Sequence, residues 1–133
     1  MVSVDIHWWA IIGAAVVNMV LGAIWYAPML FGSAWMAEMG KKGQMKMQPG
    51  NMLAMFIIAL GIGYVLSHFV AYAGANTFKL GVEAGVWASL GFFALPMASG
   101  TFAGGSSWKL WAIVSGYWVV SLSLMGGILA MVR

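Results

Sequence analysis

The sequence contains no cysteine, and only 7% of its residues are charged. The absence of cysteine excludes disulfide bonds, thiolate metal sites and cysteine nucleophiles. Soluble domains usually contain about 25% charged residues, so the scarcity of charge excludes an ordinary soluble domain. Hydrophobic residues make up 63% of the chain. The composition therefore predicts an integral membrane protein.

The chain also has no clear internal repeat, and its 133 residues leave no room for a soluble domain beside the hydrophobic segments. A membrane-spanning helix needs about 20 apolar residues. We expect an all-α fold with a single membrane domain over residues 1–133. Its predicted parts are four transmembrane helices, at about 7–27, 52–74, 81–103 and 108–132, and one amphipathic interfacial helix at about 30–42.

The few charges are unevenly placed. The net charge of +3 arises from 6 basic and 3 acidic residues, and Lys41, Lys42 and Lys46 share one connection. This grouping predicts contact with anionic lipid headgroups of the bilayer and argues against nucleic acid. Lys109 falls on the same predicted side, against Lys79 and Arg133 on the other. By the positive-inside rule, both termini are expected to be extracytoplasmic.

The stretch from Trp25 to Trp35 forms a corner in the predicted fold. Trp25 and Tyr26 are residue types that concentrate at the membrane interface. Pro28 then favours a bend over a continued helix. Beyond it, Phe31 and Trp35 share one helical face. We therefore expect these five residues to anchor an interfacial helix that lies along the membrane surface.

The corner residues also follow the pattern Trp-Tyr-x-Pro-x-x-Phe-Gly-x-x-Trp, and Gly116-Tyr117-Trp118 and Met125-Gly126 follow in the last predicted span. With these features the chain resembles a family of small bacterial four-helix membrane proteins that is labelled only as a domain of unknown function. The resemblance covers essentially the whole chain. It implies four spans in the bacterial cytoplasmic (inner) membrane and no established reaction, substrate or cofactor.

His68 is the strongest candidate for a functional polar residue. It lies within the second predicted span, and Tyr64 and Tyr72 stand one turn to either side of it. Ionisable residues inside spans are costly and are therefore often functional. The imidazole is expected to accept a proton or bind a ligand with its phenol partners. The alternative is a neutral histidine that holds neighbouring helices together.

A metal site is chemically permitted at the outer end of the predicted bundle. Asp5, His7, His68 and Glu83 fall there, and two imidazoles with two carboxylates suit zinc or another divalent ion. Their spacing is not diagnostic, because Asp5 is also explained as a helix cap and Glu83 as a first-turn acid. The sequence identifies no cofactor.

Asn18 lies near the middle of the first predicted span. It is expected either to line a polar pathway with Ser89, Ser99, Ser115 or Ser121, or to hold the register between packed helices. Ala14, Asn18 and Gly22 form a stripe of small residues, and the last span carries another. Because one small bundle has little need of several such stripes, we expect a homo-oligomer in which one stripe faces a second copy.

Three classes of function follow from these features. The first is a small transporter or channel with a polar site around His68, Tyr64, Tyr72, Asn18 and Glu83. The second is a membrane scaffold or accessory subunit without transport activity. An enzyme is the least favoured, since only the outer-end acids and histidines would supply its chemistry.

Overall fold

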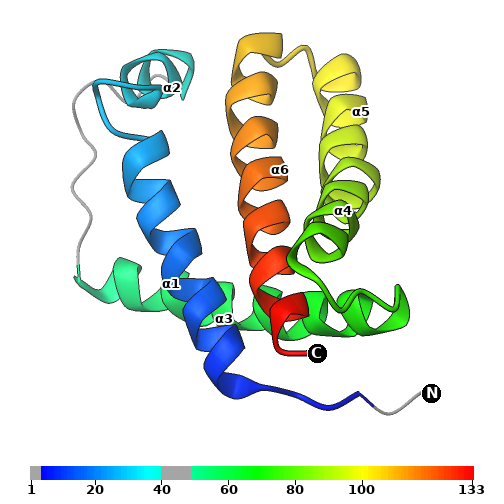
Figure 1. The fold of residues 1–133 in the computed structure, drawn as a ribbon. Helices are drawn as coiled ribbons and strands as arrows, with labels where there is room; N and C mark the ends of the chain where they lie inside the picture. Colours follow the sequence, from blue (N-terminus) through cyan, green and yellow to red (C-terminus); the bar gives the residue numbers. More distant parts are fainter. Residues whose placement is uncertain (1–3, 40–48) are drawn as a thin grey trace.

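The computed structural model describes residues 4–39 and 49–133, and every regular element in these ranges is helical (Figure 1). Within these described residues, 4 helices are long and apolar enough to cross a membrane. They are α1 (Trp8–Trp25), α3 (Pro49–Tyr72), the continuous run of α4 (Phe78–Ser89), η1 (Leu90–Ala94) and α5 (Leu95–Gly104), and α6 (Trp108–Met131). The predicted fold class is confirmed, and we treat the chain as a membrane protein.

A short helix, α2 (Gly32–Met39), follows the corner after α1. It occupies the first part of the expected interfacial helix. Residues 40–42, the last part of that expected helix, lie outside the described residues. Lys41, Lys42 and Lys46, the proposed lipid contacts, also lie outside them.

The helices pack around α6. Figure 1 shows α6 between α1 on one side and the α4–α5 run on the other, and α4 and α6 form the most extensive helix pair. A Cβ atom at Gly81 would overlap the carbonyl oxygen of Gly126, and one at Gly85 would overlap that of Leu122. Glycine at these positions therefore lets the two backbones approach directly.

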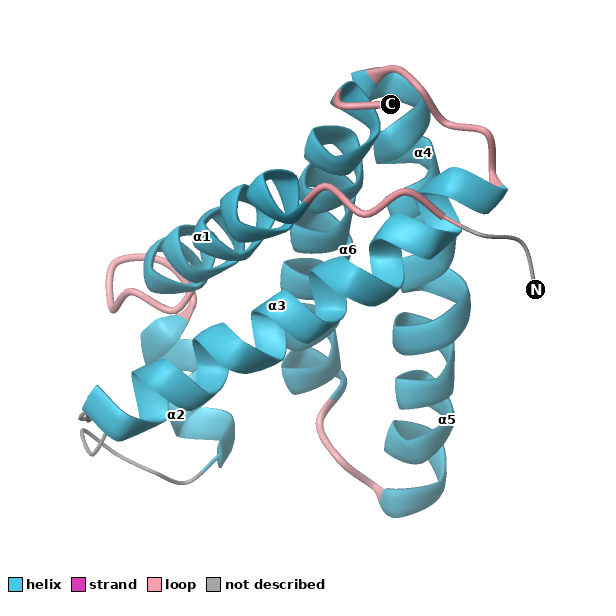
Figure 2. Ribbon diagram, turned by 90° about the horizontal axis from the view of Figure 1, so that it is seen from below, coloured by secondary structure: helices cyan, strands magenta, loops and turns pink. Residues whose placement is uncertain are grey.

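The third helix, α3, lies across α1 and α6 instead of running beside them (Figures 1 and 2). A short connection of the residues between Tyr72 and Phe78 joins α3 to α4, yet α3 does not run beside α4 over its length. The crossing is close because Gly63 faces Ile11, whose Cγ2 would lie 3.2 Å from an added Cβ. Because the residues where the helices cross are small, and those on either side are exposed, α3 can pack against its neighbours at an oblique angle.

The third span begins earlier than the expected residue 81. Thr77 caps α4, because its Oγ1 accepts a hydrogen bond from Leu80 N at 3.2 Å. Glu83 therefore lies beyond the first turn, and the expectation that it is a first-turn acid was wrong. The span then widens into the π-helical turn η1, where Leu95 N–H donates to the carbonyl of Leu90. Pro96, which has no N–H to donate, follows directly after this turn.

The two described ends of the chain meet. Arg133 Nη1 donates to the backbone carbonyl of Asp5 at 3.3 Å. Figure 1 shows both termini at the same end of the molecule. This arrangement is what an even number of spans produces.

Candidate functional site

The buried polar residues of α1 and α6 form one hydrogen-bonded cluster. Asn18, only 5% exposed, donates from Nδ2 to Ser121 Oγ at 2.7 Å. The Tyr117 hydroxyl donates toward the backbone oxygen of Asn18 at 2.9 Å and toward Oδ1 at 3.0 Å. Met125 Sδ lies 3.7 Å from both Asn18 Nδ2 and Ser121 Oγ. Asn18 is thus occupied by packing partners, as the packing alternative predicts.

The residues of the predicted corner gather around Tyr117. The Trp25 indole N–H donates to the carbonyl of Ile113 at 3.0 Å, and its ring centre lies 6.3 Å from that of Tyr117. Tyr26 lies 5.3 Å from Tyr117 and 5.5 Å from Trp35, between ring centres. Phe31 packs on Trp25 at 4.8 Å. Aromatic pairs of this kind contribute about 0.5–1.5 kcal/mol each beyond their burial.

The backbone of the corner is closed by its own hydrogen bonds. Phe31 N donates to Trp25 O at 3.1 Å, and Gly32 N donates to Ala27 O at 3.0 Å. A Cβ atom at Gly32 would overlap the carbonyl oxygen of Tyr26, so this position requires glycine. Pro28 itself is exposed at the bend. Through the contacts of Trp25 and Tyr26 with α6, the corner holds the end of α1 against α6.

His68 does not face the interior of the bundle. It lies half-buried on the outer face of α3, with ring centres 4.9 Å from Tyr64 and 6.1 Å from Tyr72. Tyr64 is 42% exposed and Tyr72 is 52% exposed. Trp8 stacks on Tyr64 at 5.8 Å. We call Tyr64, His68 and Tyr72 the α3 ridge.

The hydrogen bond of His68 fixes its tautomer. Nδ1 lies 2.9 Å from the backbone carbonyl oxygen of Tyr64. A carbonyl oxygen only accepts, so Nδ1 carries the hydrogen, and in the neutral ring Nε2 is left as an acceptor. Among the described residues, Nε2 has no hydrogen-bond partner.

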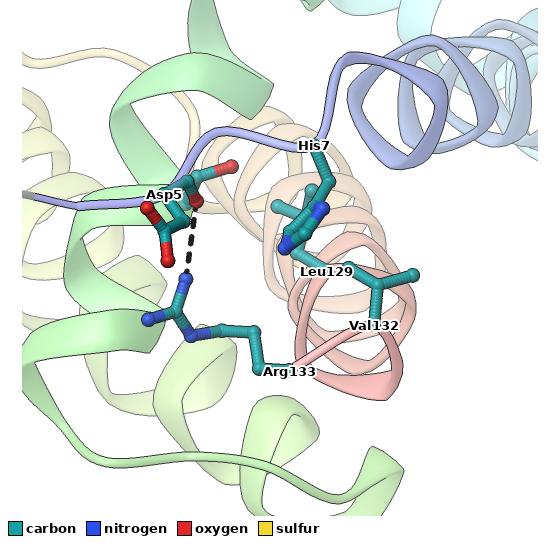
Figure 3. A pocket seen from close by; sticks show the side chains of 6 residues that line it. Asp5, His7, Leu129, Val132 and Arg133 are labelled. Carbon is teal, nitrogen blue, oxygen red and sulfur yellow. Dashed lines mark hydrogen bonds between the residues drawn. The ribbon is translucent and has the colours of Figure 1, made fainter.

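The four candidate metal ligands do not converge. Among the described residues, no group of three or more His, Cys, Asp or Glu side chains is placed to hold a metal ion. Asp5 and His7 border a crevice of about 10 Å³, room for about one water molecule, together with Arg133 (Figure 3). The Arg133 guanidinium opposes a cation there. Glu83 is exposed on α4 and does not line the crevice.

An open apolar groove of about 350 Å³ lies along α6. Trp25 from the end of α1 and Trp111 from the start of α6 stand at its sides, and Leu90 and Ala94 of η1 form a wall. The Trp111 indole N–H donates to the Ala94 carbonyl at 2.9 Å. We call this concavity the α6 groove; its floor consists of Ala112, Ser115, Gly116, Val119 and Val120.

Comparison with known proteins identifies the family of this chain but assigns no activity to it. A family model described as "Protein of unknown function (DUF1761)" matches residues 9–130. The chain belongs to this family. No curated protein and no solved structure matches the chain. The expected family with a domain-of-unknown-function label is confirmed, and its description assigns no reaction from which a catalytic residue could be taken.

Sequence reasoning missed two residues that organise the site. Tyr117 was noted only as part of a motif, yet it joins Asn18 to the aromatic corner. Trp111 was not singled out, although it borders the α6 groove and ties α6 to η1. The available signal was the spacing of Tyr117 and Ser121, four residues apart on one face of an apolar helix.

Proposed function

We propose that this protein is a homo-oligomeric scaffold or accessory subunit of the bacterial cytoplasmic membrane, and that α3 is its contact helix. One observation carries the proposal, namely that the α3 ridge faces outward from a helix of membrane-spanning length. Tyr64 stands about 12 Å from the end of this helix, at 1.5 Å per residue. Tyr64 is 42% exposed, and the His68 Nε2 has no hydrogen-bond partner among the described residues.

Polar groups that face hydrocarbon are unfavourable unless they find a partner. A second copy of the chain brings the same ridge, and a two-fold axis would place acceptor Nε2 atoms opposite donor hydroxyl groups. Gly61 lies on the same face of α3, with no atom within 4 Å of an added Cβ. It leaves space for close approach of a second helix.

The interior favours a scaffold over a path through one protomer. Asn18, Ser121 and Tyr117 use their polar groups on one another. Gly22 faces Tyr117, and Gly116 faces Trp25. In this proposal the α3 ridge, and not a stripe of small residues, meets the second copy.

The orientation in this proposal follows the lysines. The end that carries α2 and Lys109 is cytoplasmic. From the sequence, Lys41, Lys42 and Lys46 contact anionic lipid in this proposal. Both termini are then extracytoplasmic, in keeping with the contact between Asp5 and Arg133 at one end of the molecule.

Disulfide cross-linking tests the contact helix, because the natural chain has no cysteine. Gly61→Cys in membranes is expected to form a cross-linked dimer on oxidation. Gly100→Cys is the matched control, since it also has no atom within 4 Å of an added Cβ but lies on α5. Equal cross-linking of both variants, or none at residue 61, would reject α3 as the interface.

A second candidate function is a transport path between copies, which is favoured by the free acceptor on His68. Protons are the simplest cargo for an imidazole flanked by phenols. Proteoliposomes with a trapped pH-sensitive dye would show proton flux in the natural protein and its loss in His68→Ala. Flux no greater than in empty liposomes would remove this candidate and leave the scaffold.

A further inference from the structure

The polar side-chain groups that line the α6 groove already have partners within the chain. The indole N–H groups of Trp25 and Trp111 both donate to backbone carbonyls. The Ser115 hydroxyl is turned toward Met97 Sδ, 3.8 Å away. The groove surface is therefore complementary to hydrocarbon and to no polar ligand.

The two tryptophans also indicate the depth of the groove in the membrane. Trp25 is the last residue of α1, and Trp111 lies in the first turn of α6. Both therefore stand near the same end of the spans, at the level where indole rings concentrate. From there the groove floor extends along α6 from Ala112 to Val120, toward the middle of the span.

A cation stands at the outer end of the same helix face. Lys109 precedes Ala112 by three residues and Gly116 by seven, so the three residues share one face of α6. Its side chain is exposed, and lysines at span ends extend toward the headgroup layer. The face thus presents a positive charge at the surface and an apolar channel below it, which matches an anionic headgroup with a hydrocarbon tail.

The volume matches one tail. An apolar protein cavity of about 150 Å³ holds benzene. By that measure, the groove of about 350 Å³ accommodates on the order of a dozen carbon atoms. An α-helix is about 10–12 Å wide with its side chains, so a helix would lie over the groove and not within it.

We propose that the α6 groove binds one acyl chain of an anionic phospholipid, whose phosphate pairs with Lys109. The site is independent of the α3 contact. It makes the protein selective for a lipid class at one leaflet, where the headgroup and the tail are recognised together.

The test uses the full-length protein in nanodiscs with phosphatidylglycerol that carries a photoreactive diazirine in one acyl chain. Labelling of residues 112–120 is expected to exceed labelling of the exposed Val16 and Val20 on α1 at least threefold. A phosphatidylcholine with the same tail is expected to label the groove several-fold less. Equal labelling of the two helices would overturn the proposal, and so would equal labelling of the groove by the two lipids. Neither comparison requires a protein variant.

Two variants separate the headgroup from the tail. Lys109→Gln is expected to lower groove labelling by phosphatidylglycerol to the phosphatidylcholine level, whereas Lys79→Gln, at the other end of the molecule, leaves it unchanged. Ala112→Phe fills the groove and is expected to lower labelling by both lipids, whereas Ala103→Phe, at an exposed position on α5, does not. If Ala112→Phe instead converts an oligomer into a monomer in light scattering, the groove belongs to a second copy and the lipid proposal fails.

Discussion

At the scale of single residues, the cluster of Asn18, Tyr117 and Ser121 behaves as a connector between α1 and α6. The side-chain oxygen of Asn18 accepts from Tyr117, and its amide donates to Ser121. Each interhelical hydrogen bond of this kind in a membrane contributes about 0.6–1.7 kcal/mol. The cluster therefore stabilises one register of the two helices over neighbouring registers.

A double-mutant cycle measures this connection. Asn18→Leu and Tyr117→Phe are each expected to lower the free energy of unfolding by about 1 kcal/mol. Together they should cost less than the sum, because each variant already removes the bond that they share. The measurement is reversible unfolding in mixed micelles. Strictly additive losses would show that the two side chains do not act together.

Tyr26 lies just outside the first span, and its ionisation is perturbed. Burial, together with the nearby Tyr117, raises the pKa of Tyr26 to about 12. An unfolded tyrosine ionises near pH 10, so the folded protein keeps this proton in the window between about pH 10 and about pH 12. Stability from this group is fully present below the window and is lost as the pH rises through it.

Absorbance at 295 nm, where tyrosinate absorbs, checks this ionisation. The natural protein is expected to show a late tyrosine titration near pH 12 that is missing in Tyr26→Phe. In the same variant, the decline of stability with rising alkaline pH should be less steep. A late step that persists unchanged in Tyr26→Phe would assign it to another tyrosine.

At the scale of helices, the contact between α4 and α6 depends on glycine. An added Cβ at Gly81 would meet backbone atoms of Gly126, which cannot rotate away as a side chain does. Gly81→Ala is therefore expected to destabilise the protein by about 1–3 kcal/mol through overpacking. Gly100→Ala has open space around it and is expected to change stability by less than about 0.5 kcal/mol.

Thermal and denaturant unfolding of the two alanine variants in one detergent makes this comparison. The variants share the same change in helix propensity, so their difference reports the close contact alone. Equal stability would mean that α4 shifts along α6 at no cost, which contradicts a tightly packed pair.

The π-helical turn η1, which lies before Pro96, contributes to the α6 groove. A π-helical turn adds one residue to the helical circuit, and it carries Leu90 and Ala94 into the wall of the α6 groove. The Ala94 carbonyl accepts the Trp111 N–H at this point. This irregular turn thus contributes to the lining of the α6 groove.

At the scale of the whole molecule, the lysine distribution predicts the orientation in the membrane. Single cysteines can report it, because the natural chain has none. Asn76→Cys, in the connection before α4, is expected to react with a membrane-impermeant maleimide in cells with a permeabilised outer membrane. Ser106→Cys, before α6, is expected to react only after the cytoplasmic membrane is opened.

The cysteine-free natural chain is the control for nonspecific labelling. The opposite accessibility pattern would invert the protein and move the α6 groove, with Lys109, to the outer leaflet. Reaction of both positions from the same side would be incompatible with a span between residues 76 and 106.

Composition and local pattern were sufficient for the helices. Twenty-residue apolar runs have few alternatives in a bilayer, since each backbone polar group must be satisfied within its own segment. The corner at Pro28 followed from local chemistry as well. The cap of α6 is equally local, because Ser107 Oγ accepts a hydrogen bond from Lys109 N at 3.1 Å. Local rules succeed here because the interactions involved join residues close in sequence.

The directions that side chains face were decided only by the tertiary structure. His68 was expected beside an interior path, but α3 crosses its neighbours. Tyr64 and Tyr72, which flank His68, are exposed. Asn18 and Tyr117 meet across about a hundred residues of chain, and an almost uniformly apolar helix offers no polar face from which to predict such a pairing. In a membrane protein, residues that face lipid and residues that face the core are both apolar. The sequence by itself therefore determined the spans, while close packing of glycines and aromatic rings decided which faces meet.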